Sequence, residues 1–185
     1  IQQELKKTVI LVTHDLDEAI RLADQIAIMN SGKLIQYDTP EIILTKPADK
    51  FVHDFVGTDR ALKRLSRINI EGYIKSALAI NIRASIQEAI TMMGNRPSIW
   101  VVDDENCLLG WIDRRHIKGS ESIEQALVRG GLDEISIMSG STLREALSRM
   151  LGLGFKNIPV INEVKCLVGE LSLSDVEAAT SEFET

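Results

Sequence analysis

The sequence is poor in the residues that mark several functional classes. Its 185 residues include only two cysteines, Cys107 and Cys166, too few and too far apart along the chain for a disulfide framework or a metal site. Aromatic residues make up 4% and the formal net charge is −6. Nucleic-acid-binding proteins need a basic surface and often stacking rings. We therefore expect a protein of a reducing compartment, with no metal and no nucleic-acid partner.

Long apolar runs and a phosphate-binding loop are also missing. Apolar segments such as 9–12 and 26–29 fall far short of the roughly 20 residues that cross a bilayer. The amino end carries Glu4 and no small-residue cleavage site, so we expect no signal peptide. No Gly-x-x-x-x-Gly-Lys-Ser/Thr run occurs, so this chain alone is not expected to hydrolyse ATP. The hydrophobic content of 44% suffices for one large buried core or two small ones.

Hydrophobic periodicity changes sharply near the amino end. β-branched residues over 8–13 predict a buried strand, and apolar residues at helical spacing from Leu16 onward predict a helix directly after it. Strands over 25–29 and 33–37, joined by Asn30-Ser31-Gly32, predict a tight hairpin.

A basic stretch separates this region from the rest of the chain. Before it, Thr39-Pro40 predicts the capped start of a helix, and a further helix is expected over 47–56. Residues 58–70 then carry four basic residues and one acidic residue. The stretch is interpreted either as a solvated helix end that joins two acidic modules or as a surface for anionic lipid or an acidic partner, sensitive to ionic strength. The cations are Arg60, Lys63, Arg64 and Arg67.

The remaining sequence contains an internal repeat. Residues 84–93 align with 141–150, so that Glu88-Ala89 falls on Glu145-Ala146. A hairpin follows each helix, SIWVVDDENCLLGWI in the first copy and NIPVINEVKCLVGEL in the second, and each closes with a polar turn into a predicted helix, DRRHI and SLSDV. Each unit has about 60 residues, too few to bury its own sheet well, so the copies should pack face to face.

This repeat resembles a tandem pair of CBS domains. The family's pattern of a hydrophobic residue and proline, followed by Gly-x-x-Ser/Thr-x-x-Asp, is matched in the second copy by Ile158, Pro159, Ser172 and Asp175. The resemblance implies a nucleotide site, because a hydroxyl at a helix amino end can hold phosphate oxygens and an aspartate can accept hydrogen bonds from ribose hydroxyls. The alternative is that Ser172 and Asp175 only cap the last helix.

The first copy departs from the family pattern. Trp100 stands where proline is expected, Asp113 where a hydroxyl is expected, and His116 where aspartate is expected. A carboxylate at 113 would repel phosphate unless His116 is protonated or Arg114 and Arg115 neutralise it. We therefore expect this site to be empty of nucleotide, to take another ligand, or to turn Arg114 and Arg115 toward a dimer partner.

The amino-terminal 57 residues resemble the last third of the nucleotide-binding domain of an ABC transporter. The register of Thr13-His14-Asp15, the Gly32 turn and Thr39-Pro40 carries the resemblance. It implies that His14 is the switch histidine that contacts the γ-phosphate of ATP, at the carboxyl end of a strand. ATP and Mg²⁺ would be cofactors only of a full-length subunit, which would also supply the missing phosphate-binding loop, signature loop and catalytic glutamate.

The combination of an ABC fragment with a CBS pair resembles the energy-coupling subunit of osmoregulatory importers for glycine betaine, carnitine, choline or proline betaine. The implied function is ATP-driven uptake, gated by a CBS pair that senses ionic strength or an adenine nucleotide, with cyclic di-AMP among the candidates. The implied partners are a second copy through the CBS pair, a transmembrane permease and, indirectly, an extracellular substrate-binding protein. The implied location is cytoplasmic, at the inner face of the plasma membrane.

The expected fold is therefore α/β (α+β), an ABC remnant followed by two β-α-β-β-α repeats that form a Bateman module. The expected divisions are 1–57 for the ABC fragment, 58–70 for the linker, 71–119 for the first CBS domain and 120–180 for the second. Two other functions stay open: a ligand-free dimerisation module and a stand-alone adenine-nucleotide-binding regulator.

Overall fold

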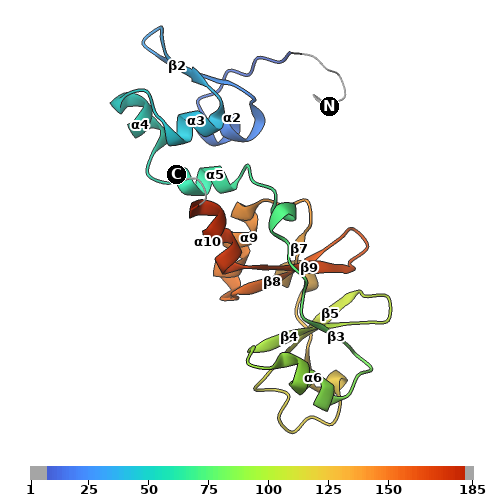
Figure 1. The fold of residues 1–185 in the computed structure, drawn as a ribbon. Helices are drawn as coiled ribbons and strands as arrows, with labels where there is room; N and C mark the ends of the chain where they lie inside the picture. Colours follow the sequence, from blue (N-terminus) through green and yellow to red (C-terminus); the bar gives the residue numbers. More distant parts are fainter. Residues whose placement is uncertain (1–7, 182–185) are drawn as a thin grey trace. The chain divides into compact units, whose positions relative to one another are not determined.

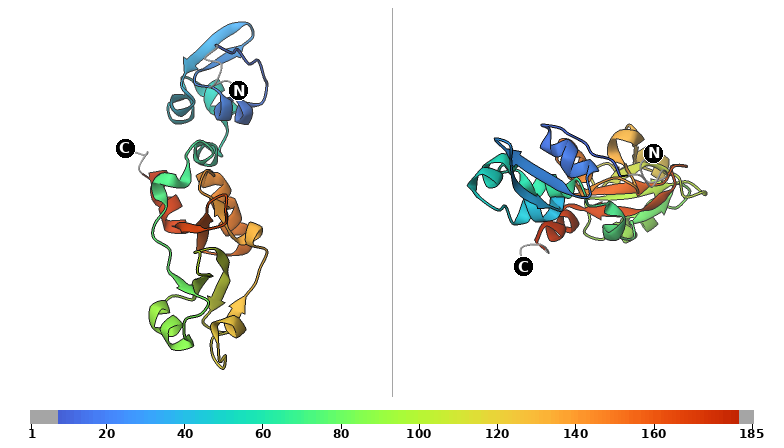
Figure 2. Two further views of the ribbon diagram at one scale, coloured as in Figure 1. Left: turned by 90° about the vertical axis from the view of Figure 1, so that its right-hand side faces the viewer. Right: turned by 90° about the horizontal axis from the view of Figure 1, so that it is seen from above.

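The computed structural model describes residues 8–181. Its helices and strands are drawn in Figure 1 and from two further directions in Figure 2. The chain divides into two compact units, Ile1–Ile68 and Asn69–Thr185. The fold is mixed α/β with a repeated strand-helix-hairpin motif in the second unit, as predicted.

The first unit packs helices against a two-stranded hairpin. Strands β1 (Ile26–Asn30) and β2 (Lys33–Asp38) are antiparallel, and Ser31 and Gly32 turn the chain with φ of 49° and 78°, as the Asn-Ser-Gly sequence predicts. Apolar residues from the hairpin and helices meet in one core, and the helices are α2 (Leu16–Leu22), α3 (Pro40–Thr45), α4 (Lys50–Val56) and α5 (Arg60–Leu65).

Side-chain caps set the helix starts. The Thr39 hydroxyl accepts from the Ile42 N–H, with Pro40 in the first turn of α3, as predicted. Helix α4 begins at Lys50 rather than at Pro47, because the Asp49 carboxylate accepts from the Val52 N–H at 2.8 Å and so caps the helix there.

The predicted strand over 8–13 is wrong for this chain. No strand among residues 8–181 pairs with it, and its side chains face solvent, with Ile10 87% and Val12 91% exposed. A strand needs a neighbour to satisfy its backbone groups and cover its apolar face. The sheet that could supply one is not formed by the described part of the sequence.

The second unit holds two small sheets. In the first the strand order is β3-β4-β5-β6, and in the second it is β7-β8-β9. The elements of the first repeat are β3 (Ala79–Asn81), α6 (Ile86–Met93), β4 (Ser98–Val102), β5 (Leu108–Asp113), α7 (Ile123–Ala126) and β6 (Leu127–Val128). Those of the second are α8 (Leu132–Ile135), β7 (Ile137–Met138), α9 (Leu143–Leu153), β8 (Asn157–Ile161), β9 (Leu167–Ser172) and α10 (Leu173–Ser181), and the 3-10 turn η1 (Ile70–Tyr73) precedes both repeats.

The repeat predicted from sequence is confirmed in local detail. Helices α6 and α9 each start with a capping box, Ser85 with Glu88 and Thr142 with Glu145. In each repeat the first strand runs parallel to the second, and the second and third strands form an antiparallel hairpin. The matching capping residues and apolar patterns of the two copies thus produce the same helix starts and strand pairing.

The two sheets face each other across a shared core. Along β4, Ile99 and Val101 pack into the core of the first repeat with α6, while Trp100 and Val102 point to the opposite face. There they meet residues of the second repeat, including Ile161. Because both faces of β4 are covered, the strand is apolar throughout, as fully buried strands are.

Each hairpin carries a glycine where another segment approaches closely. A Cβ added at Gly110, whose φ is 151°, would lie 2.3 Å from the carbonyl oxygen of Val128. A Cβ at Gly169 would lie 2.5 Å from the carbonyl oxygen of Lys75. The second contact places Lys75 against the second repeat. Its backbone pairs with Glu170 although Lys75 precedes the first repeat in sequence.

The helix predicted at DRRHI in the first repeat is wrong. Residues 114–119 form turns instead. In the second repeat Ser172 and Asp175 exchange hydrogen bonds between side chains and backbone N–H groups and so start α10. In the first repeat the Asp113 carboxylate bonds the N–H of Arg115, two residues on, which favours a turn.

Candidate functional site

Asp175 is the central ionisable group of the candidate site. It lies in the first turn of α10 and is 7% exposed. Its carboxylate forms an ion pair with Lys75 and accepts from the Ser172 N–H at 3.0 Å and from the Ser172 hydroxyl. Ser172 and Asp175 therefore lie together, as the sequence pattern predicts, and Lys75 joins them from a distant part of the sequence.

The environment keeps Asp175 ionised. Burial raises the pKa of this carboxyl, but hydrogen bonds from Lys75 and Ser172 outweigh the burial, so its pKa lies below the ordinary value. A buried anion with one exposed cationic partner is a suitable acceptor for hydroxyl donors of a ligand. The Lys75 side chain is 70% exposed, so its ammonium group can move without opening the core.

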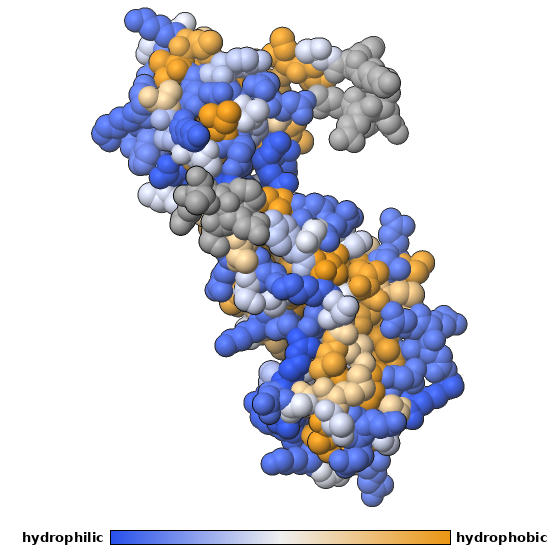
Figure 3. Space-filling view, viewed as in Figure 1, coloured by the Kyte–Doolittle hydropathy of each residue, from blue (hydrophilic) through white to orange (hydrophobic). Residues whose placement is uncertain are grey.

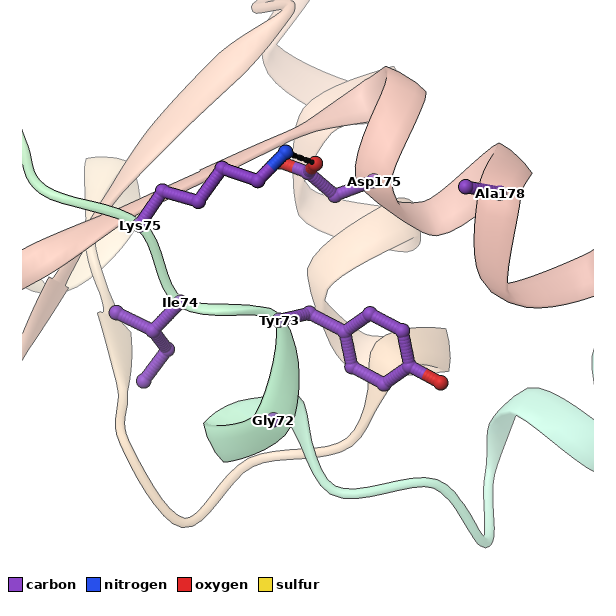
Figure 4. Close-up of a pocket in the computed structure, with 6 residues that line it drawn as sticks. All are labelled: Gly72, Tyr73, Ile74, Lys75, Asp175 and Ala178. Carbon is purple, nitrogen blue, oxygen red and sulfur yellow. Dashed lines mark hydrogen bonds and ion pairs between the residues drawn. The ribbon is translucent and has the colours of Figure 1, made fainter.

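An open depression surrounds this pair. It has a volume of about 460 Å³ and is lined by residues from η1, the segment after it and α10. Figure 4 shows the Tyr73 ring on the opposite side of the opening from the Lys75–Asp175 pair. The lining residues are Gly72, Tyr73, Ile74, Lys75, Asp175 and Ala178.

The other two predicted residues of the second copy lie on strand β8. Ile158 is fully buried, and Pro159 is buried opposite Glu170 in the β8–β9 pairing. Neither lines the depression. They hold the strand next to Ser172, which pairs with Asn157 at the end of the hairpin.

In the equivalent region of the first copy, the charged side chains of Asp113 and Arg114 bond groups of the same repeat. Asp113 forms a two-pronged ion pair with Arg115, with distances of 2.9 and 2.7 Å. Hydrogen bonds from the Arg115 guanidinium lower the pKa of Asp113 to about 2. Arg114 donates to the backbone carbonyls of Gly94 and Arg96, so it holds the end of α6. His116 is exposed.

A buried polar contact joins the two repeats at Trp100, the residue that replaces the expected proline. The Trp100 indole N–H donates to the Glu170 carboxylate at 3.0 Å, and both residues are buried. Arg96 forms an ion pair with the same carboxylate. Trp100 and Glu170 thus pack against each other where one repeat faces the other.

Sequence comparison identifies the repeat. The CBS domain model matches residues 70–122 and 132–182. The chain belongs to the CBS domain family. It carries a tandem CBS pair. The depression is lined by residues of both matched segments, 72–75 from the first and Asp175 and Ala178 from the second.

Curated relatives extend over both units. The chain is 39% identical over 178 residues to the carnitine transport ATP-binding protein OpuCA of Listeria monocytogenes, with 91% of this chain and 44% of that protein covered. It is 35% identical over 181 residues to the choline transport ATP-binding protein OpuBA of Bacillus subtilis, with 91% and 46% covered. The chain therefore spans less than half the length of these osmoprotectant-importer subunits.

Solved structures resemble the CBS pair. Staphylococcus aureus OpuCA superimposes with a TM-score of 0.53 at 25% identity, covering 61% of this chain and 97% of that one. CBSX2 in complex with AMP superimposes with a TM-score of 0.56 at 13% identity, covering 64% and 99%. The second likeness supports the fold alone. Together they confirm the Bateman arrangement of two CBS repeats.

The predicted residues of the first unit lie apart from the CBS pair in sequence and are placed as follows. His14 is exposed just before α2, whose amino end is capped by Asp15. Arg64 bonds Glu41, and Arg67 donates to the carbonyls at the carboxyl end of α2, as is favourable there. The remaining two cations contact nearby groups, Arg60 with His53 and Lys63 with Asp17, Asp59 and the Val56 carbonyl.

Lys75, Tyr73 and Glu170 were not predicted as site residues. Lys75 and Tyr73 precede the first strand of the first repeat, and nothing in the local sequence links them to the second. One sequence feature could have indicated the contact. Gly169 matches Gly110 in the other hairpin, and a glycine in a strand often marks a place where another backbone segment packs closely, as Lys75 does here. Over residues 8–181, no helix is both long and apolar enough to cross a membrane, and no cluster of three metal-ligating side chains occurs.

Proposed function

We propose that this chain is the regulatory part of the ATP-binding subunit of an osmoprotectant importer, and that its second CBS domain binds an adenine nucleotide at Asp175. The observation that carries the proposal is the buried, ionised Asp175 beside an open depression, within reach of an exposed lysine. The similarity to OpuCA and OpuBA over both units supports the transport context.

The site offers complementary groups for a ribose and a phosphate. Ribose hydroxyls would donate to Asp175, which accepts through two oxygens. A phosphate would draw the Lys75 ammonium away from Asp175, because a phosphate carries more charge than the carboxylate and is solvated at the surface. Tyr73 provides an aromatic ring at the opposite side of the opening, suited to contact with a base.

Binding is tested by calorimetric titration of the whole chain with AMP, ATP, cyclic di-AMP and adenosine. We expect at least one nucleotide to bind more tightly than adenosine. Asp175→Asn should weaken it by at least about tenfold, because the neutral amide accepts less strongly and also donates, while Asn can still cap α10. Lys75→Met should reduce the preference for nucleotide over adenosine.

The matched control is Asp113→Asn, the acidic residue at the equivalent hairpin end of the first repeat. It should leave nucleotide affinity unchanged. No binding of any of the four compounds by the folded wild-type chain, or equal affinity in Asp175→Asn, would contradict the nucleotide site. The ligand-free dimerisation module would then be the better interpretation.

The same transport context supplies the remaining proposals. In the full-length subunit ATP and Mg²⁺ would bind upstream elements, and His14 would contact the γ-phosphate. The subunit would attach to a transmembrane permease at the cytoplasmic face of the membrane and act indirectly with an extracellular substrate-binding protein. His14→Ala in the full-length subunit should abolish ATP hydrolysis, and intact hydrolysis would remove His14 from the mechanism.

A second copy is the partner proposed for the CBS pair. Helix α9 ends with Leu151, 68% exposed, and Leu153, 37% exposed, and apolar side chains in this position favour association. Sedimentation equilibrium should give a dimer for the whole chain. Leu151→Asp should shift it to monomer, whereas Glu163→Lys, at an exposed turn, should not.

A further inference from the structure

The two cysteines lie next to each other in the folded protein. Cys107 and Cys166 occupy equivalent positions of the two hairpins and are 59 positions apart in sequence. Their sulfur atoms are 3.8 Å apart, and both side chains are half-buried. The distance along the chain that argued against a disulfide framework is therefore no obstacle in the fold. Figure 3 shows a band of apolar residues on one face of the second unit.

The backbone holds the two residues directly opposite each other. They form an isolated antiparallel bridge. The Leu108 N–H donates to the Lys165 carbonyl at 3.1 Å and the Leu167 N–H to the Asn106 carbonyl at 2.8 Å. This pattern makes Cys107 and Cys166 a non-hydrogen-bonded pair, whose Cα atoms are typically about 4.5 Å apart. Disulfides span Cα separations of about 4.4 to 6.8 Å.

A further hydrogen bond fixes the contact between the hairpin tips. The Asn106 side-chain amide donates to the Leu167 carbonyl at 2.7 Å. The two thiols are thus presented to each other by a framework of three bonds between the repeats, and none of these bonds depends on the sulfur atoms. For a covalent bond, the sulfur atoms have to approach from 3.8 Å to about 2 Å.

We propose that Cys107 and Cys166 form a reversible disulfide that locks the two CBS repeats together at their hairpin tips. The oxidant is a low-molecular-weight disulfide. One protein thiolate attacks it to form a mixed disulfide and releases one small thiolate, which takes up a proton. The second protein thiol, after loss of its proton, attacks the protein sulfur of the mixed disulfide and expels the other small thiolate. Two protein thiols are oxidised, and one small disulfide is reduced to two thiols.

The local charges tune the rate of this exchange. The hydrogen bond with Cys166, partial burial and the nearby carboxylates of Asp103 and Glu105 raise the pKa of Cys107 above its ordinary value. Since the thiolate is the attacking species, oxidation should be slow at neutral pH and accelerate as the pH rises. The pair therefore resists chance oxidation and responds to a sustained shift of the thiol pool.

A metal is a poorer occupant of this contact. Zinc and related ions require three or four protein ligands. Within residues 8–181 no third histidine, cysteine or carboxylate completes such a cluster.

The test is oxidation of the whole chain in glutathione buffers of defined ratio, followed by alkylation, digestion without reductant and mass spectrometry. We expect a Cys107–Cys166 cross-link within monomeric chains. Half-oxidation should occur at a buffer ratio at least about tenfold more reducing for the folded chain than for the chain in concentrated urea. The oxidised chain should melt on the order of 10 °C higher than the reduced chain.

The matched control moves one thiol along its strand. The double substitution Cys166→Ser with Val168→Cys keeps the cysteine count but puts the second thiol at a diagonal position, about 7 to 8 Å away. It should give glutathione adducts and little cross-link. Glutathione adducts or cross-linked dimers in place of the internal bond in wild-type protein would overturn the proposal. Equal half-oxidation ratios in the folded and the urea-unfolded chain would overturn it as well.

Discussion

The contact between Glu170 and Trp100 makes a measurable prediction about how the repeats are held together. Glu170→Ala removes the acceptor of a buried indole N–H and the partner of Arg96. An orphaned buried donor costs about 1–3 kcal/mol. The Arg96 side chain is 38% exposed, so loss of its ion pair adds at most about 1 kcal/mol. We expect a total loss of about 1–4 kcal/mol in the free energy of unfolding.

Tryptophan fluorescence isolates the effect. Trp100 and Trp111 are the two tryptophans in the sequence, and both lie in the second unit, so urea titration by fluorescence reports the CBS pair alone. The midpoint should fall with little change in slope. By thermal melting the loss corresponds to a decrease of roughly 4–16 °C in the melting temperature.

Matched variants separate the hydrogen bond from general damage. Glu170→Gln keeps an acceptor for the indole and should cost less than Glu170→Ala. In the double variant with Trp100→Phe the orphaned donor is gone, so the losses should fall short of additive by about 1–2 kcal/mol. Glu163→Ala, at the exposed turn of the same hairpin, should cost almost nothing. If Glu170→Ala costs no more than Glu163→Ala, the buried contact does not stabilise the pair.

Three further predictions follow from single contacts. Because the folded pKa of Asp113 is about 2, its ion pair stabilises the protein above the ordinary carboxyl pKa and is lost as pH falls from about 4 to about 2. After allowance for solvent screening, wild type should lose about 1 kcal/mol more than Asp113→Asn over this range in acid titrations, because carboxylates such as Asp175 titrate in both proteins. Thr142→Ala removes the cap of α9 and should cost about 1 kcal/mol by urea denaturation. Gly169→Ala should lower the melting temperature by several degrees and weaken nucleotide binding, since the added Cβ would displace Lys75; unchanged affinity would contradict the role of Lys75.

The repeat could be predicted from sequence because its determinants are local. The capping residues Ser85 and Thr142 and the apolar stripes that follow them recur in register, and each acts within one helical turn. The burial of the second strand on both faces agrees with its sequence, since a strand covered on both faces is apolar throughout.

Two local predictions were wrong for physical reasons. Residues 8–13 have the composition of a central strand, yet a strand forms only when a neighbour is available. The segment after Asp113 resembles the helix start of the other repeat, but the side chain that should reach back to the cap is His116 rather than an aspartate. Asp113 instead bonds the backbone two residues on, and the turn prevails.

The site was harder to predict than the fold because it combines distant segments. Ser172 and Asp175 are three residues apart and were found as a pattern, whereas Lys75 lies 100 positions from Asp175. Lys75 reaches Asp175 because the segment before the first repeat pairs with the sheet of the second repeat at Glu170.

Duplication places equivalent residues opposite one another, and the sequence differences between the copies then decide what each half can do. Cys107 meets Cys166, its own equivalent, where the two hairpins cross. Away from that point the partners are unlike: Trp100 of one sheet meets Glu170 of the other, although their equivalents are Pro159 and Trp111. One repeat thus supplies a bulky indole and the other its buried acceptor. The same asymmetry puts an ionised acceptor, Asp175, beside the opening at α10, whereas the residue of the first repeat that is equivalent to Asp175 is His116.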